Sequence, residues 1–401
     1  MMNTPTATSP VITQEEALDQ WLYKALTGDH QIAIWRTPKT NSAEIILDQS
    51  GKTKRVNLEL DALPQGFIVH PFADQEDGKA YFLEASEYVK FEIGQSITQE
   101  DGQSYERIGL SPSTIKRQIR QLIRKCQPKK SSDDFTSTSK ERFIETVQKC
   151  IEAITEGHLS KVVPARIQKI HLNEDFDVAK TFLSLCKAYP DAFINFFHIP
   201  NVGTWLGATP EILIKTEGNY FQTMALAGTQ KAEGEDPVKN AAWKQKEIEE
   251  QAMVSRYIVN NFKKIRLREY EENGPRTVKA GNLLHLRSDF RVDMEAANFP
   301  QLGSTMLKLL HPTSAVCGTP REASMKFIYD HEQFDRCFFA GFIGPVNIEG
   351  QTAIYVNLRT AQFINEEVLL YAGAGVTADS IPEKEWEETT LKCDIIGKFI
   401  Q

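Results

Sequence analysis

The sequence lacks any pairing pattern among its cysteines. Six cysteines are scattered along 401 residues and none forms a CxxC pair: Cys126, Cys150, Cys186, Cys317, Cys337 and Cys393. This spacing argues against a disulfide framework and against a structural zinc site. No apolar run approaches the roughly 20 residues that cross a bilayer, and the polar residues 1–10 lack the apolar region of a signal peptide. We therefore expect a cytoplasmic protein that does not associate with a membrane.

An excess of positive charge is also absent. The formal net charge is −8 at pH 7, which argues against binding to nucleic acid or to an acidic membrane surface. A small anionic substrate is still compatible with this total, because a few arginines and lysines outweigh it within one site. The length of 401 residues suits two average domains or one large α/β unit, and no repeat or low-complexity tract divides the chain.

Residues 1–130 are predicted to form a variable flank, of which residues 1–12 should be disordered. Thr13 and Glu16 have capping-box spacing, so a helix should begin there and extend to about residue 26. Short apolar runs indicate strands of an antiparallel sheet at 31–35, 44–47, 66–69 and 80–83. A helix near 113–125 then leads to the polar stretch 127–137, which is the best linker candidate in the chain.

Residues 138–401 are predicted to form the functional core. Thr138 and Glu141 repeat the capping-box spacing, and apolar residues follow at helical intervals. Strands are expected at 161–168, 192–198, 211–216, 220–226, 283–291, 336–344, 352–361 and 366–371, with a long helix at 237–262 and further helices starting at Thr319-Pro320 and behind Ser380. We therefore predict a large α+β fold in which antiparallel sheets pack against helices, and in which flank and core form one structural unit.

Two acidic segments far apart in the sequence are its most informative feature. Residues 246–251 read KEIEEQ and residues 385–388 read EWEE. Glu247 and Glu250, and likewise Glu385 and Glu388, stand three residues apart and share a helix face. Four carboxylates brought together need a cation between them, and oxygen ligands suit Mg²⁺. A solvated helix face is the alternative interpretation of each segment taken alone.

Two residues at strand ends are the candidate base and acid. Lys161 heads an apolar strand, and burial beside another cation would lower its basicity so that it can serve as a general base. Glu211 follows a turn at 206–210 and precedes an apolar strand. A partly desolvated carboxyl at that place has a raised pKa, which suits a general acid. An exposed strand-end lysine and an exposed turn glutamate are the simpler interpretations.

Several other segments have features of an anion site. Small residues at 226–229 and 373–375 let backbone amides approach a ligand. Arg359 lies in a strand-like run, where its partner would be a substrate carboxylate or a structural salt bridge. His311 opens the segment HPTSAVCGTP and is a candidate for substrate binding, with a structural hydrogen-bonding role as the alternative.

Taken together, residues 138–401 resemble the chorismate-utilising enzymes. The matching motifs, in order, are SKVVPAR, GATPE, LAGT, KEIEEQ, LHPTSAVCGTPRE, RCFFAGFIG, NLRTA and YAGAGV followed by SIPEKEWEETTLK. This family contains isochorismate synthases, salicylate synthases, anthranilate synthase component I and aminodeoxychorismate synthase component I. The number of ordered motifs identifies the chain as a member, most similar to the isochorismate synthases.

The resemblance implies a role for each candidate residue. Mg²⁺ would be held, directly or through water, by Glu247, Glu250, Glu385 and Glu388, and would bind the ring carboxylate of chorismate. The substrate would contact Thr229, His311, Arg359, Gly373, Ala374, Gly375 and Lys392. Lys392 lies four residues after Glu388, so the two share one helix face. We expect chorismate as the substrate, no glutaminase subunit and, since no amphipathic dimerisation helix stands out, a monomer.

Single positions select the branch of the family. Members that use ammonia typically carry glutamine at the position of Lys161, whereas those that add water carry lysine, because water needs a base to become a nucleophile. Glu211 would protonate the departing C4 hydroxyl after water attacks C2. Ala227 argues against the aminodeoxychorismate branch, which usually has a lysine there. Gln251 and Cys317 depart from the family's frequent histidine and glycine without touching an assigned role.

Phe339 bears on where the reaction stops. Salicylate synthases carry a tyrosine at this position, so Phe339 favours release of isochorismate before pyruvate is eliminated. We therefore predict a Mg²⁺-dependent isochorismate synthase that acts reversibly, in menaquinone or siderophore biosynthesis. The alternatives are a salicylate synthase and a catalytically silent homologue that binds chorismate-like anions. The presence of Lys161, Glu211 and the four glutamates argues against the silent homologue.

Overall fold

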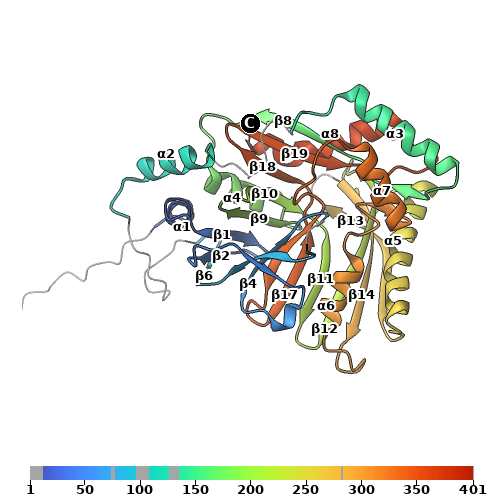
Figure 1. The fold of residues 1–401 in the computed structure, drawn as a ribbon, viewed down its shortest axis with the longest axis horizontal. Helices are drawn as coiled ribbons and strands as arrows, with labels where there is room; N and C mark the ends of the chain where they lie inside the picture. Colours follow the sequence, from blue (N-terminus) through green and yellow to red (C-terminus); the bar gives the residue numbers. More distant parts are fainter. Residues whose placement is uncertain (1–11, 74–76, 96–107, 126–134, 281–282, 401) are drawn as a thin grey trace, which may run out of the picture.

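Two large antiparallel sheets form the centre of the molecule, and helices surround them (Figure 1). The computed structural model describes residues 12–73, 77–95, 108–125, 135–280 and 283–400. Within these residues no helix is both long enough and apolar enough to cross a membrane. Residues 1–11 of the predicted disordered terminus and most of the predicted linker lie outside the described residues.

Each large sheet combines strands from distant parts of the sequence. In order across the sheet, the eight-stranded one contains β6 (Glu87–Glu92), β2 (Ser42–Asp48), β1 (Gln31–Arg36), β9 (Phe193–Ile199), β10 (Gly203–Thr209), β18 (Thr360–Ile364), β19 (Glu367–Gly373) and β8 (Ala165–His171). The nine-stranded sheet contains β13 (Glu271–Ala280), β14 (Leu283–Asp293), β12 (Tyr220–Lys231), β11 (Ile212–Glu217), β17 (Gln351–Val356), β16 (Phe342–Val346), β4 (Gly66–His70), β5 (Ala80–Glu84) and β3 (Lys54–Val56). A third, two-stranded sheet pairs β15 (Gly318–Thr319) with β7 (Lys161–Val162). The predicted α+β class with antiparallel sheets is confirmed.

The helices are α1 (Gln14–Thr27), η1 (Leu60–Ala62), α2 (Pro112–Ile123), α3 (Lys140–Thr155), α4 (Val178–Ala188), α5 (Gln245–Lys264), α6 (Leu302–Leu310), α7 (Arg321–His331) and α8 (Pro382–Ile400). Helices α1, α4 and α8 pack on the eight-stranded sheet through β1, β9 and β19, while α5 and α6 pack on the nine-stranded sheet. Strand β1 therefore buries both of its faces: Ala33 and Trp35 enter the larger core, and Ile32 and Ile34 the core beneath α1 and α4.

In each large sheet the strands of the flank lie together at one end and pair with the strands of the core at a single junction. β1 pairs with β9, and β4 pairs with β16, so pairings join residues before 95 to residues after 190. Both sheets are consequently built from the whole described chain, and the site described below is set between segments that are distant in sequence.

Several predicted boundaries are wrong for identifiable reasons. α5 starts at Gln245 rather than at residue 237, because Trp243 Nε1 donates to Thr277 Oγ1 and ties the preceding segment to β13. The N-cap of α3 is Ser139 rather than Thr138, which instead hydrogen-bonds Ile167 of β8 through its backbone amide and hydroxyl oxygen. Residues 336–341 are not a strand, because Cys337 and Ala340 have positive φ angles.

Two further predictions identify the right segments but assign the wrong local conformation to single residues. Pro320 is the N-cap of α7 rather than its first residue, because Thr319 belongs to β15. Gly207 lies within β10 rather than in a turn, and the break before β11 falls at Pro210. By contrast, α1 begins behind the predicted capping box of Thr13 and Glu16.

Candidate active site

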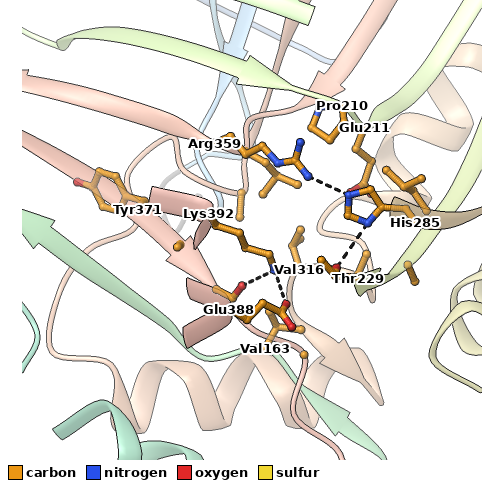
Figure 2. Close-up of a pocket in the computed structure, with 18 of the residues that line it drawn as sticks. Val163, Pro210, Glu211, Thr229, His285, Val316, Arg359, Tyr371, Glu388 and Lys392 are labelled. Carbon is orange, nitrogen blue, oxygen red and sulfur yellow. Dashed lines mark hydrogen bonds and ion pairs between the residues drawn. The ribbon is translucent and has the colours of Figure 1, made fainter. Parts of the chain in front are cut away.

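A cavity of about 110 Å³ lies where the ends of several strands meet α5 and α8. Its wall includes residues at the ends of β10, β12, β18 and β19, so both large sheets contribute (Figure 2). Charged side chains of both signs line it: Glu211, Glu250, Glu388, Arg336, Arg359 and Lys392. Apolar groups form the remainder, among them Val163, Val316, Phe339 and Tyr371. The arrangement suits an anionic molecule with an apolar ring.

Glu211 occupies the predicted position between β10 and β11 and is buried, with 6% of its surface exposed. Pro210 interrupts the strand before it, and the Glu211 carbonyl oxygen accepts from the Val356 amide, which fixes the backbone at this point. Burial raises the pKa of Glu211 to about 7, against the opposing effects of Lys161, Arg359 and Lys392. A carboxyl with this pKa is partly protonated at neutral pH, which is the state a general acid needs.

Lys161 is even more deeply buried, with 1% of its surface exposed. β7 pairs closely with β15, and only a glycine fits at position 318: a Cβ there would lie 2.2 Å from the Lys161 carbonyl oxygen. The ammonium lies 2.7 Å from Glu250 Oε1, and a Cβ on Gly375 would lie 2.6 Å from the same oxygen. Gly375 is therefore the residue that makes room for the pair, and Lys161 lies directly behind Gly375 and Glu250 in the cavity wall.

Arg359 projects into the cavity and is held by a histidine that the sequence analysis did not select (Figure 2). Its Nη2 lies 2.9 Å from His285 Nε2, and His285 Nδ1 lies 2.7 Å from the Gly228 carbonyl oxygen. Burial and then the Arg359 charge lower the pKa of His285 to about 3. The imidazole is therefore neutral, donates from Nδ1 to Gly228 and accepts from Arg359 at Nε2. Thr229, a predicted substrate contact, also lines the cavity.

Only two of the three residues of the glycine-rich segment at the end of β19 line the cavity. Gly373 and Gly375 line the cavity, and Lys392 Nζ lies 2.8 Å from the Gly373 carbonyl oxygen. Ala374 is not among the residues that line the cavity. Its methyl group is fully buried in the core, and its amide donates to the Pro164 carbonyl oxygen, because pairing continues past the end of β19.

His311 does not line the cavity, and its predicted contact with the substrate stays a prediction. Its Nε2 hydrogen-bonds the Pro71 carbonyl oxygen at 3.2 Å, and its ring packs against His70 and Phe342. Burial lowers the pKa of His311 to about 3, so the neutral ring acts as a structural hydrogen-bonding group. The residue directly follows α6 and ties that helix end to the segment that leaves β4.

Arg336 is a second cavity residue that the sequence analysis did not assign. Its guanidinium donates to the Val163 and Val316 carbonyl oxygens at 2.7 and 3.0 Å and pairs with Glu332. Arg336 therefore joins the residue that follows β7, Val163, to the segment that precedes β15. Buried arginines inside an ion pair show no periodic sequence signal, and this role was invisible in the sequence.

Three of the four predicted metal ligands meet near the cavity, and each is paired with a lysine. Glu250 pairs with Lys161, Glu385 with Lys246 and Glu388 with Lys392, at N–O distances of 2.7, 2.8 and 2.7 Å. Burial and then the neighbouring Glu388 carboxylate raise the pKa of Glu385. The carboxylates thus surround positive charge in this structure, and lysine ammonium groups supply it.

Glu247 differs from the other three glutamates. Its Oε2 accepts from the Lys244 amide at 2.9 Å and so caps the first turn of α5. Among the described residues no three acidic, histidine or cysteine side chains are arranged as a ready metal site. The donor set of Glu250, Glu385 and Glu388 nevertheless fits Mg²⁺ in its chemistry, since it offers only carboxylate oxygens around one cationic position.

Comparisons with known proteins agree with this geometry. Residues 90–401 match the family model described as chorismate binding enzyme. The isochorismate synthase EntC of Escherichia coli is 29% identical over 257 residues, which are 62% of this chain and 64% of EntC, slightly less than two thirds of that relative. The vibriobactin-specific isochorismate synthase of Vibrio cholerae is 26% identical over 71% of this chain and 70% of its own length.

Among solved structures, MenF, the menaquinone-specific isochorismate synthase of Escherichia coli, has the same fold. It superposes with a TM-score of 0.73 over 96% of this chain and 91% of MenF, at 21% sequence identity. Since the family model spans more than half of the sequence and includes every residue of the cavity, the chain belongs to the chorismate-binding enzyme family.

Proposed function

We propose that this protein is a Mg²⁺-dependent isochorismate synthase that interconverts chorismate and isochorismate. The observation that carries the proposal is the presence of buried Lys161 and Glu211 at one site with Arg359 and Lys392. The names of the relatives support the same reaction. They include relatives named for vibriobactin and for menaquinone, so the proposal concerns the reaction and leaves the pathway open.

The cationic side chains orient the substrate. Chorismate carries two carboxylates, and Arg359 and Lys392 are placed to bind them with charge-assisted hydrogen bonds. Glu250, Glu385 and Glu388 would hold Mg²⁺, and Glu247 would stand nearby in the first turn of α5. The bound ion would supply positive charge to the ring carboxylate. Phe339 stacks on Tyr371 with 5.4 Å between ring centroids, and both line the cavity as an apolar wall.

Lys161 and Glu211 divide the proton transfers between them. Lys161 is the base: its amine accepts a proton from water, whose oxygen bonds to C2. The C1–C2 and C5–C6 double bonds shift to C1–C6 and C4–C5, and the C4–O bond breaks. Glu211 donates its proton to the departing hydroxyl, which leaves as water. One water enters and one leaves, and the enzyme ends with Lys161 charged and Glu211 ionised, which is the protonation state that the reverse reaction requires.

The cavity favours isochorismate over salicylate as the released product. Phe339 carries no hydroxyl, and the Tyr371 hydroxyl donates to Gln362 Oε1 at 2.7 Å in the core. Neither aromatic side chain is thus free to hydrogen-bond the enolpyruvyl group and hold it in position for elimination.

The test is chromatographic product analysis after incubation of the purified protein with chorismate and Mg²⁺. Isochorismate as the main product supports the proposal. Stoichiometric salicylate and pyruvate would support a salicylate synthase instead, and binding of chorismate without turnover would indicate a silent homologue.

A further inference from the structure

Glu250, Glu385 and Glu388 form an acidic cluster, and each of them pairs with one lysine. The lysine that pairs with Glu385 differs from the other two. Lys392 lines the catalytic cavity, Lys161 lies directly behind its wall, and both have roles in the proposed reaction. Lys246 does not line the cavity, and no step of that reaction uses it. Its ammonium lies 2.8 Å from Glu385 Oε1 and 3.2 Å from Ser380 Oγ, at the contact between the first turn of α5 and the start of α8.

The charge of Lys246 acts on the whole carboxylate cluster. Besides its direct pair with Glu385, its ammonium is stabilised electrostatically by Glu250 and Glu388. The Glu385 side chain is only 4% exposed, and a buried carboxylate without a partner is strongly destabilising. Lys246 therefore supplies positive charge directly to Glu385 in the protein without a metal ion.

A divalent cation and the Lys246 ammonium compete for the same oxygens. Two cations on one buried carboxylate repel each other, so binding of a divalent cation weakens the pairing of these carboxylates with their lysines. Lys161 is fully buried and Lys392 is held by both Glu388 and the Gly373 carbonyl oxygen. Lys246 has a side chain that is 31% exposed and a flexible four-carbon stem, so it is the lysine able to move into solvent.

We propose that Lys246 is a displaceable counter-ion of the metal site, which holds Glu385 in the metal-free protein and is exchanged for Mg²⁺. This inference rests on the metal site of the proposed function. It assigns to Lys246 the role of setting the affinity for Mg²⁺, because each binding event must break the Lys246–Glu385 pair.

The first test is calorimetric titration of Mg²⁺ into metal-free protein without substrate, for the wild type and for Lys246→Met. Removing the competing ammonium should tighten the Mg²⁺ dissociation constant by up to about fivefold, the range expected from loss of a partly exposed ion pair. Lys239→Met is the matched control, since it removes the same charge from a largely exposed side chain that pairs with Asp236 outside the cluster, and it should leave the constant unchanged. Lys246→Arg should resemble the wild type.

The outcomes separate this inference from the metal site itself. If the wild type takes up no Mg²⁺, the metal site and the inference both fail. If the wild type binds Mg²⁺ and Lys246→Met binds it equally or more weakly, the metal site stands and the displacement is disproved. Thermal unfolding of the metal-free variants confirms that each one is folded before its titration is interpreted.

The second test follows Lys246 directly. An amine-acetylating reagent, followed by peptide mass spectrometry, measures how accessible each lysine is. Mg²⁺ should raise the labelling of Lys246 in the wild-type protein several-fold, while the exposed Lys239 serves as the internal reference. Unchanged labelling of Lys246 at a saturating Mg²⁺ concentration would overturn the proposal.

Discussion

The imidazole of His285 accepts a hydrogen bond from Arg359, with 2.9 Å between His285 Nε2 and Arg359 Nη2. A histidine accepts here only because its other nitrogen donates to the Gly228 carbonyl oxygen. The Gly228 carbonyl oxygen in β12 thus orients the neutral His285 ring, and His285 orients the guanidinium of Arg359, the residue that precedes β18 of the eight-stranded sheet.

Replacing His285 by Phe should impair substrate binding more than the chemical step. Without the acceptor, Arg359 loses a charge-assisted hydrogen bond, whose typical contribution of about 1.5–3 kcal/mol predicts a KM for chorismate raised roughly ten- to a hundredfold. Steady-state kinetics that separate KM from kcat provide the measurement. A fall in kcat with an unchanged KM would contradict the positioning role.

Loss of either proton-transfer group should reduce turnover strongly while the fold survives. Lys161→Ala and Glu211→Gln should each lower kcat by about 100-fold or more, as is typical when a general acid or base is removed. Circular dichroism of each variant controls for folding. Normal turnover by Lys161→Ala would show that another group activates water.

The stability of the protein should depend on pH through Glu211. Its pKa is raised from 4.5 to about 7 in the folded state, so the folded protein binds this proton more tightly than the unfolded chain does. The resulting stabilisation is fully present below pH 4.5 and is lost as the pH rises through 7. A shift of this size corresponds to about 3 kcal/mol.

Denaturant unfolding between pH 4.5 and 8 measures this dependence. Glu211→Gln should make the slope of the unfolding free energy against pH more positive than it is in the wild type. The slope left in that variant combines Asp19, whose pKa burial also raises to about 7, with the opposite contribution of His285 and His311, whose pKa burial lowers to about 3. Equal slopes in wild type and Glu211→Gln would show that Glu211 titrates as an ordinary carboxyl.

Removal of divalent ions should abolish activity. EDTA treatment should reduce turnover to background, and Mg²⁺ should restore it. Glu250→Gln and Glu388→Gln should raise the Mg²⁺ concentration needed for half-maximal activity, because each removes a charged oxygen donor. Full activity in rigorously chelated buffer would contradict the assignment of a required Mg²⁺ site.

The reaction should stop at isochorismate and run in both directions. The two isomers differ only in the positions of a hydroxyl and the ring double bonds, so their equilibrium should be near balance. Isochorismate supplied alone should give chorismate, and a pyruvate-coupled assay should show only minor elimination. Stoichiometric pyruvate formation by the wild type would contradict the role assigned to Phe339.

The sequence allowed the fold class and much of the site to be predicted, since regular spacing and ordered motifs are local properties. Lys161 and Glu211 lie where their strand-end positions placed them, and the buried environment raises the pKa of Glu211 as expected. What could not be predicted depends on contacts between distant segments. His285 and Arg336 act through partners that are close only after both sheets have formed.

The same limit applies to the predicted site residues that the structure places outside the cavity wall. His311 and Ala374 belong to motifs that surround the cavity, but the side chain of one and the amide of the other are already bonded within the fold. The acidic cluster likewise revealed the need for a cation, whereas the three lysines that supply positive charge come from β7, α5 and α8. A motif shows which residues are near a site, but not which of their atoms are free.

The pairing of early with late strands at one junction in each large sheet has a consequence for biosynthesis. β4 can complete its ladder only after β16 has been synthesised, and β1 only after β9. The first strands therefore emerge from the ribosome with unsatisfied edges, and such edges favour aggregation until the partner arrives. A truncated chain without the flank would leave β9 and β16 as the new open edges, so residues 138–401 should not be a soluble unit by themselves. Folding of this enzyme is thus a late event in its synthesis, completed only when its last strands are available.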